Sequence, residues 1–126
     1  MNNQESSNVN KKIQINSAVE LANLIKENVY VVIKISASWC GPCKNEKFLN
    51  NYNKLKNNYI SINSIKFIEF DVDLHLDIIK DKKYYDIEIS SVPTFIVTKN
   101  GHFTRKFEGC NHLQQINEYL YNNINE

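Results

Sequence analysis

Residues 36–44 read SASWCGPCK and place two thiols, Cys40 and Cys43, where an apolar run gives way to a helical pattern. The unpaired N–H groups at the start of a helix favour a thiolate over a thiol, so Cys40 is expected to be a nucleophile. Pro42 suits the first turn of a helix, and Gly41 leaves room for a partner chain to approach closely. The spacing also lets Cys43 reach Cys40 within the same chain.

The length and charge of the chain limit the kinds of protein it can be. It has 126 residues, 42% of them hydrophobic, which suits one domain with its own core. Fifteen basic and fourteen acidic residues give a formal net charge of +1, so we expect neither nucleic acid nor a membrane as a partner. We expect the protein to be a monomer. Three cysteines, only two of them with redox spacing, make no disulfide framework and favour a reducing compartment.

The first twelve residues differ in composition from the rest. Residues 1–12 carry one apolar residue after the first Met, so we predict a disordered tail, followed by one domain over residues 13–126. We recognise neither a targeting segment nor a run long enough to cross a membrane. The cytoplasm is therefore the expected location.

Hydrophobic periodicity predicts alternating strands and helices around the dithiol stretch. The expected strands cover residues 13–15, 29–35, 65–71, 94–98 and 102–107. The expected helices cover residues 18–27, the segment after Cys43 as far as 57–58, 74–84 and 112–124. Residues 29–35 are apolar on both faces except at Lys34, as expected of a central strand covered on each side. We expect the helix at 74–84 to lead to a parallel pairing, and Asn100-Gly101 to form a hairpin turn.

Two motifs resemble a known family. The segment Trp39–Lys44 resembles the active site of the thioredoxin family, and Ser91–Thr94, which reads SVPT, resembles its cis-proline loop. The resemblance extends from about Ile13 to the C-terminus and includes the strand-like residues 67–73 and the turn at 107–109. It implies an α/β thioredoxin fold, in which a central mixed sheet of about five strands is flanked by helices on both faces.

The resemblance also implies a function, which is protein-disulfide reduction in the maintenance of cell redox homeostasis. Cys40 would attack a disulfide in a client protein, and Cys43 would resolve the mixed disulfide. A separate, NADPH-dependent thioredoxin reductase would then reset the dithiol. The chain has no Gly-rich phosphate loop, so we expect no cofactor besides the Cys40–Cys43 pair, and no metal.

The family's supporting residues carry over position by position. Trp39, Gly41 and Pro42 would support the redox site. The client-binding surface would comprise Trp39, Val92, Pro93 and Gly109, with a cis Val92–Pro93 bond facing Cys40 and backbone groups offered to an extended client segment.

The sequence departs from the family at two charged positions. Typical thioredoxins have a buried acid at the position of Lys34 and a lysine at that of Glu69, so the signs are exchanged here. If both side chains face the same side of the sheet, they form a charge pair beneath the dithiol. The helix after the motif also has Phe48 in place of the family's kinking proline, so we expect a straighter helix.

Other interpretations of the thiols remain open at this point. A non-catalytic adaptor would use the same surface only for binding, and a zinc module would need two more ligands, for which Cys110 and His112 are poorly spaced. An oxidase or isomerase would use the same chemistry, although Gly-Pro between the thiols resembles the reducing members. We interpret Cys110 as a small buried hydrophobe, or as a thiol near the client surface that is open to oxidation.

Overall fold

The computed structural model describes residues 13–81 and 87–124, so the tail predicted at residues 1–12 lies outside the described residues. The strands are β1 (Tyr30–Ser36), β2 (Ile65–Asp71), β3 (Thr94–Lys99) and β4 (His102–Glu108). The helices are α2 (Ala18–Glu27), the short 3-10 helix η1 (Pro42–Lys44), α3 (Glu46–Tyr59), α4 (Val72–Ile79) and α5 (Leu113–Ile124). Helices and strands thus alternate through the first half of the described chain, as the hydrophobic pattern predicts.

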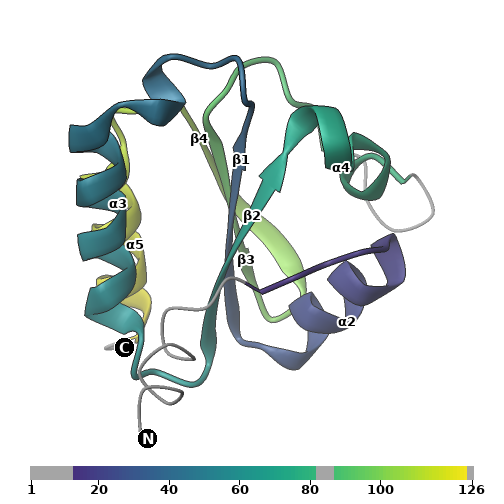
Figure 1. Ribbon diagram of the computed structural model, residues 1–126. Coiled ribbons are helices and arrows are strands. Elements are labelled where there is room, and N and C mark those ends of the chain that lie inside the picture. The colour runs from purple at the N-terminus through teal and green to yellow at the C-terminus, as the bar shows by residue number, and fades with distance from the viewer. Residues whose placement is uncertain (1–12, 82–86, 125–126) are drawn as a thin grey trace, which may run out of the picture.

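The strands form one mixed sheet in the order β2-β1-β3-β4 (Figure 1). β1 pairs with β2 in parallel, and both β1 with β3 and β3 with β4 are antiparallel. The described residues contain four strands rather than the expected five, because residues 13–15 have no strand conformation. Ile13 and Ile15 instead pack their side chains against the core, which accounts for the alternation that suggested a strand.

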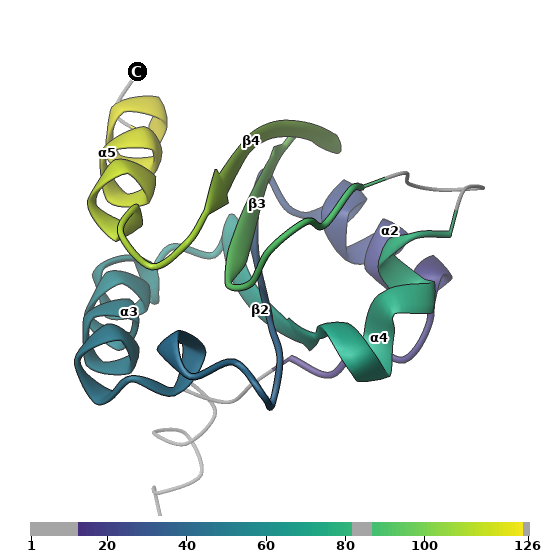
Figure 2. The same ribbon diagram turned by 90° about the horizontal axis from the view of Figure 1, so that it is seen from above.

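Helices cover both faces of the sheet, which confirms the predicted layers. α2 and α4 lie on one face, and α3 and α5 lie on the other (Figures 1 and 2). β1 lies between two strands, and its side chains alternate between the two layers of core: Val31, Ile33 and Ile35 pack on the α2 side. Tyr30 and Val32 pack on the α3 side. A strand buried on both faces makes a charged residue within it, Lys34, conspicuous.

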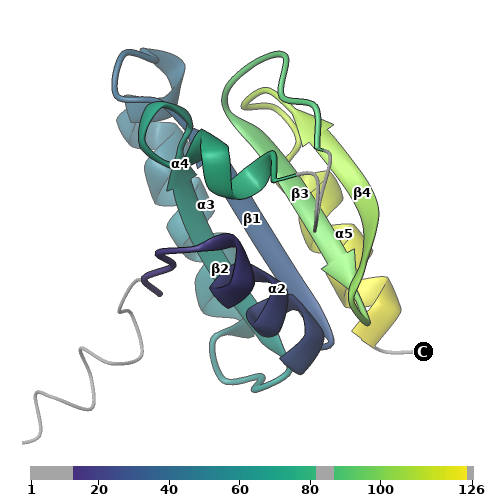
Figure 3. The same ribbon diagram turned by 90° about the vertical axis from the view of Figure 1, so that its right-hand side faces the viewer.

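Two expectations about the connections are wrong. The parallel pairing comes from the α3 connection between β1 and β2, whereas the chain beyond α4 enters the sheet antiparallel to β1 (Figure 3). α4 also begins two residues earlier than predicted, at Val72, because the Asp71 carboxylate accepts hydrogen bonds from the N–H groups of Asp73 and Leu74 at 2.8 and 3.3 Å. It ends at Ile79, and the predicted continuation to residue 84 reaches residues outside those described.

Local signals at the ends of other elements are confirmed. Ser17 caps α2 by accepting a hydrogen bond from the N–H of Glu20 at 3.2 Å. Asn100 and Gly101 have φ values of 52° and 85° and form the two-residue turn between β3 and β4. No helix within residues 13–81 or 87–124 combines the length and apolar character that crossing a lipid bilayer requires.

Candidate active site

The two thiols form a disulfide at the carboxyl end of β1. Cys40 and Cys43 are both buried, their Cα atoms are 5.3 Å apart, and the N–H of Cys43 lies 3.2 Å from Cys40 Sγ. The segment between the strand and α3 is not the continuous helix that the sequence suggests. Pro42–Lys44 forms one 3-10 turn, after which Asn45 is extended and caps α3 through the N–H of Phe48 at 3.0 Å. The dithiol therefore sits on its own turn, ahead of the helix.

The loop before β3 lies directly against this turn. The Val92–Pro93 peptide bond is cis, as the resemblance implies, and the Val92 carbonyl oxygen lies 3.7 Å from Cys40 Sγ. The Pro93 carbonyl accepts a hydrogen bond from the N–H of Gly109 at 2.8 Å. Gly109 has a φ of 97°, a conformation that favours glycine. Three of the predicted client-binding residues thus gather beside the dithiol.

Trp39 directly precedes Cys40 and lies at the surface. Its side chain is 67% exposed, which confirms the expected position at the surface, and its indole Nε1 donates a hydrogen bond to Asp73 Oδ2 at 2.8 Å. No sequence pattern indicated this contact of Asp73, which lies in the first turn of α4, two residues after the capping residue Asp71. Gly41 is exposed, and a Cβ atom added there would meet nothing within 4 Å. The fold itself therefore does not require glycine at position 41.

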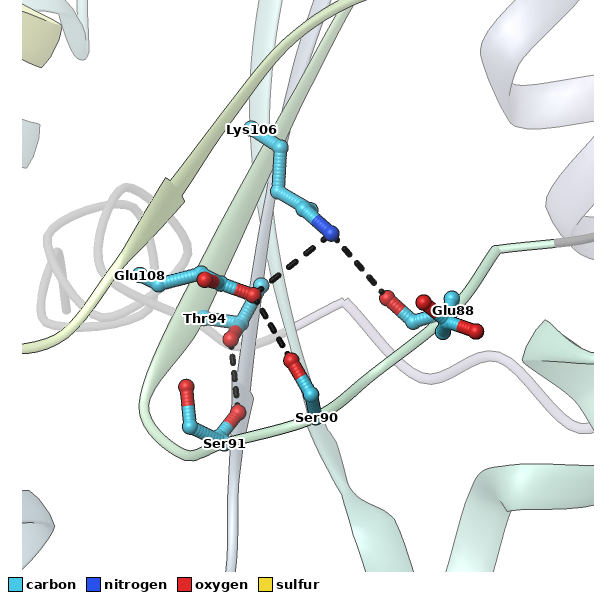
Figure 4. A network of polar contacts seen from close by, with 6 residues as sticks. All are labelled: Glu88, Ser90, Ser91, Thr94, Lys106 and Glu108. Atoms are coloured by element: carbon cyan, nitrogen blue, oxygen red, sulfur yellow. Dashed lines mark hydrogen bonds and ion pairs between the residues drawn. The ribbon is translucent and has the colours of Figure 1, made fainter.

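A second group of residues that the sequence did not indicate holds the cis-proline loop in place (Figure 4). Glu108 Oε2 accepts a hydrogen bond from Ser90 Oγ at 3.0 Å and lies 3.5 Å from Lys106 Nζ. The same ammonium group donates to the carbonyl of Glu88 at 3.4 Å. These contacts tie the loop that leads to Val92 to the edge strand β4. Their long sequence separation explains why no local pattern reveals them.

Lys34 and Glu69 meet as the sequence predicts. They are opposite one another in the parallel pairing of β1 with β2, and Lys34 Nζ lies 3.9 Å from Glu69 Oε1. The other carboxylate oxygen of Glu69 lies 3.4 Å from Nζ of Lys56, which the sequence analysis did not single out. Tyr52 packs against both ammonium groups, and burial, followed by the nearby Glu69 carboxylate, raises its pKa well above the usual range.

Cys110 lies near the dithiol turn and is only partly buried, which agrees better with a thiol near the client surface than with a buried hydrophobe. Its Sγ is 3.7 Å from the carbonyl oxygen of Pro42. Partial burial raises the pKa of this thiol, and the positive charge of Lys34 offsets part of that rise. Within the described ranges, no group of three or more His, Cys, Asp or Glu side chains is arranged to hold a metal ion.

A dithiol that forms a disulfide at the end of a central strand, beside a cis-proline loop, defines a thiol–disulfide oxidoreductase. The sequence as a whole agrees with this class, because residues 3–122 match the family model described as Thioredoxin. The chain belongs to the thioredoxin family, whose members are thiol–disulfide oxidoreductases.

Individual relatives cover most of the chain. Mitochondrial thioredoxin-3 of Saccharomyces cerevisiae is 35% identical over 98 residues, which cover 78% of this chain and 69% of that protein. Thioredoxin 1 of Plasmodium falciparum is 31% identical over 97 residues, or 77% of this chain and 84% of that protein. The crystal structure of oxidised yeast mitochondrial thioredoxin 3 superimposes with a TM-score of 0.71 at 29% identity, covering 90% of this chain and 97% of that one.

A second similar structure comes from work on a peroxiredoxin. It concerns the thiol-resolving mechanism in yeast mitochondrial 1-Cys peroxiredoxin through the glutathione and thioredoxin systems, and it matches with a TM-score of 0.71 at 28% identity. The match covers 90% of this chain and 97% of that chain.

Proposed function

We propose that this thioredoxin-family protein reduces disulfides in client proteins, with Cys40 as nucleophile and Cys43 as resolving thiol, and that a separate NADPH-dependent thioredoxin reductase resets it. The observation that carries the proposal is the placement of Cys40 Sγ 3.7 Å from the carbonyl oxygen of Val92, in the cis-proline loop. A sulfur atom in that position can react with a client segment that pairs with the loop backbone.

The thiol–disulfide exchange proceeds in two steps. The Cys40 thiolate attacks one sulfur of the client disulfide, the client S–S bond breaks, and the released client thiolate takes a proton from water. The Cys43 thiol then loses its proton and attacks Cys40 Sγ. The mixed disulfide breaks, the second client thiolate is protonated, and the Cys40–Cys43 disulfide remains. Two electrons have passed from the protein to the client.

The site supports the first step through its backbone. The N–H of Cys43, 3.2 Å from Cys40 Sγ, is placed to donate a hydrogen bond to the Cys40 thiolate of the reduced protein. Pro42 opens the 3-10 turn that brings this N–H back toward Cys40. The same turn holds Cys43 within reach for the second step, so the two thiols act as one unit.

The client-binding surface comprises Trp39, Val92, Pro93 and Gly109. Trp39 offers an exposed ring, and its hydrogen bond to Asp73 fixes the orientation of that ring. Gly41 keeps the surface above the dithiol low, since the space that a side chain would occupy there is open. A client backbone can therefore approach the dithiol from outside the fold.

The proposal includes a setting for this chemistry. The protein acts as a monomer in the cytoplasm, where a reducing environment keeps the third thiol, Cys110, free. Peroxiredoxins are candidate clients, because a similar solved structure concerns the resolution of a peroxiredoxin thiol. Localisation of the tagged full-length protein would test the compartment, since one relative is a mitochondrial protein.

The proposed function is tested by coupled turnover. NADPH, a thioredoxin reductase and the protein are mixed with a disulfide-containing client, and NADPH oxidation is followed. We expect turnover with the parent and none with Cys40→Ser. Full activity of Cys40→Ser would refute the catalytic assignment, and binding of the client without any turnover by the parent would favour the adaptor interpretation.

A further inference from the structure

The buried charge of Lys34 plays no part in the exchange described above. Lys34 is 4% exposed, and burying an ammonium group is costly unless something compensates for the lost hydration. A carboxylate and two aromatic rings are among the groups that compensate here. Glu69 Oε1 lies 3.9 Å from Nζ, and the ring centroids of Phe48 and Tyr52 lie 5.4 and 5.0 Å from it. A carboxylate and two ring faces all favour the charged form of Lys34.

Glu69 cannot neutralise this charge fully, because two ammonium groups share it. Lys56 Nζ lies 3.4 Å from Glu69 Oε2, closer than Lys34 Nζ lies to Oε1. The three side chains therefore carry one net positive charge. Lys56 has a side chain that is 24% exposed, whereas that of Lys34 is 5% exposed. Water screens the charge at the Lys56 end, so the positive field persists mainly at the buried Lys34 end.

The buried end of this cluster lies on the α3 side of the sheet, and contacts along the chain lead from it to the dithiol turn. Phe48, whose ring contacts Lys34, is in the first turn of α3, and its N–H bonds to Asn45. The N–H of Asn45 in turn donates to the Pro42 carbonyl at 3.2 Å, next to Cys43. Cys110 gives an independent indication, because its thiol lies 3.7 Å from that same carbonyl and experiences the positive charge of Lys34.

We propose that Lys34 tunes the reduction potential of the dithiol without contacting the client. Its buried ammonium group stabilises the reduced dithiol, so the Cys40–Cys43 couple is more oxidising than it would be in the same fold without Lys34. The proposal rests on the proposed function and deepens it, because it concerns the redox poise of the same site. Reduction of the disulfide by two electrons creates thiol groups that can ionise, whereas the disulfide carries no charge. A nearby cation therefore stabilises only the reduced form.

The cluster contains a residue whose substitution should act in the opposite direction. Lys34→Met removes the cation and leaves Glu69 paired with Lys56, so no carboxylate is stranded. Glu69→Gln removes the negative charge, keeps the shape of the side chain, and leaves the cation less compensated. A merely structural role would move both variants in the same direction, whereas an electrostatic role moves them apart.

The test is the equilibrium of each full-length protein with reduced and oxidised glutathione, with the Cys40–Cys43 state read from the masses of alkylated peptides. Lys54→Met is the matched control, because it removes a cation from an exposed position on the same helix as Lys56. We expect the equilibrium constant for reduction by glutathione to fall three- to tenfold in Lys34→Met, where tenfold corresponds to about 30 mV. We expect it to rise in Glu69→Gln and to stay unchanged in Lys54→Met.

The proposal is overturned if Lys34→Met matches the parent, or if Lys34→Met and Glu69→Gln shift in the same direction. Should Lys34→Met fail to fold, Glu69→Gln alone decides, and a constant equal to or below that of the parent overturns the proposal. Titration of the reduced thiols adds a second readout, in which Lys34→Met should ionise Cys43 at higher pH. These measurements use no client protein, so their outcome is separate from the coupled turnover assay.

Discussion

Two tyrosines on α3 allow a sharp test of how the core handles buried hydroxyl groups. Tyr52 and Tyr59 are both buried, but their hydroxyl groups have different surroundings. The Tyr52 hydroxyl has no hydrogen-bond partner among the residues that the structure describes. The Tyr59 hydroxyl donates toward Asn117, with 2.7 Å to Oδ1 and 3.0 Å to the carbonyl oxygen. The same change, Tyr to Phe, should therefore have opposite effects at the two positions.

The expected magnitudes follow from these contacts. An unpaired buried polar group costs about 1–3 kcal/mol, so Tyr52→Phe should raise the free energy of unfolding by about 1 kcal/mol. Its ring keeps its packing against Phe95 and Phe67, at centroid distances of 5.4 and 6.3 Å. Tyr59→Phe should lower the free energy of unfolding by about 1 kcal/mol, because it removes the link between α3 and α5. In a domain of this size each change corresponds to roughly 3–5 °C in Tm.

Urea unfolding of the oxidised protein provides the assay. A change of midpoint at constant slope reports stability alone, and the two variants should bracket the parent. Destabilisation by Tyr52→Phe of more than about 1 kcal/mol would show that its hydroxyl is paired in solution. Equal effects of the two substitutions would refute the hydrogen-bond assignment on which the reasoning rests.

Three further predictions concern the site. Gly109→Ala should destabilise the fold by about 1–2 kcal/mol, because Gly109 has a φ of 97°. Gly41→Ala should keep the stability of the parent, because a Cβ atom there meets nothing, but it should lose turnover with protein clients. Urea midpoints and client turnover of both variants check this, and equal losses of stability would contradict it. Burial raises the pKa of Cys110, so at pH 8 this thiol should react with iodoacetamide more slowly than an unstructured cysteine, and its reaction rate should keep rising at pH values where the rate of an unstructured cysteine has levelled off. The measurement is the pH dependence of the reaction rate in the oxidised protein, in which Cys110 is the free thiol. A pH dependence shifted to lower pH would contradict the prediction. Cys43→Ser should remain attached to its clients through Cys40, so that a reducing agent releases them from the captured protein, and recovery of no reducible adducts while Cys40 is shown to be free would count against the resolving role.

Sequence patterns predicted the features of this site that depend on nearby residues. The Cys-x-x-Cys spacing and the flanking apolar strand indicated the dithiol, and Asn100-Gly101 indicated the hairpin, because spacing and turn geometry are local properties. The Lys34–Glu69 pair could also be predicted. The family resemblance puts the two positions on neighbouring strands, and the parallel pairing of β1 with β2 brings the two opposite charges together.

Contacts that depend on the three-dimensional arrangement could not be predicted. Lys56 reaches Glu69 from α3, and Asp73 reaches Trp39 from α4, so neither contact follows from a local pattern. The contacts of Glu108 with Ser90 and Lys106 likewise join the cis-proline loop to the edge strand β4. The alternation at residues 13–15 was misleading for the opposite reason. The alternation arises because Ile13 and Ile15 pack their side chains on the core. A strand also requires a neighbouring backbone with which to pair, and residues 13–15 have no strand conformation.

Catalysis of disulfide exchange by the dithiol itself is the central claim, and one measurement tests it without any reductase. Dithiothreitol is mixed with a disulfide-bonded protein whose reduction is slow, and the rate is followed with catalytic amounts of the parent, Cys40→Ser or Cys43→Ser. The account predicts that the parent accelerates reduction over many turnovers, and that Cys40→Ser leaves the rate at that of dithiothreitol alone. Equal acceleration by the parent and Cys40→Ser would contradict it.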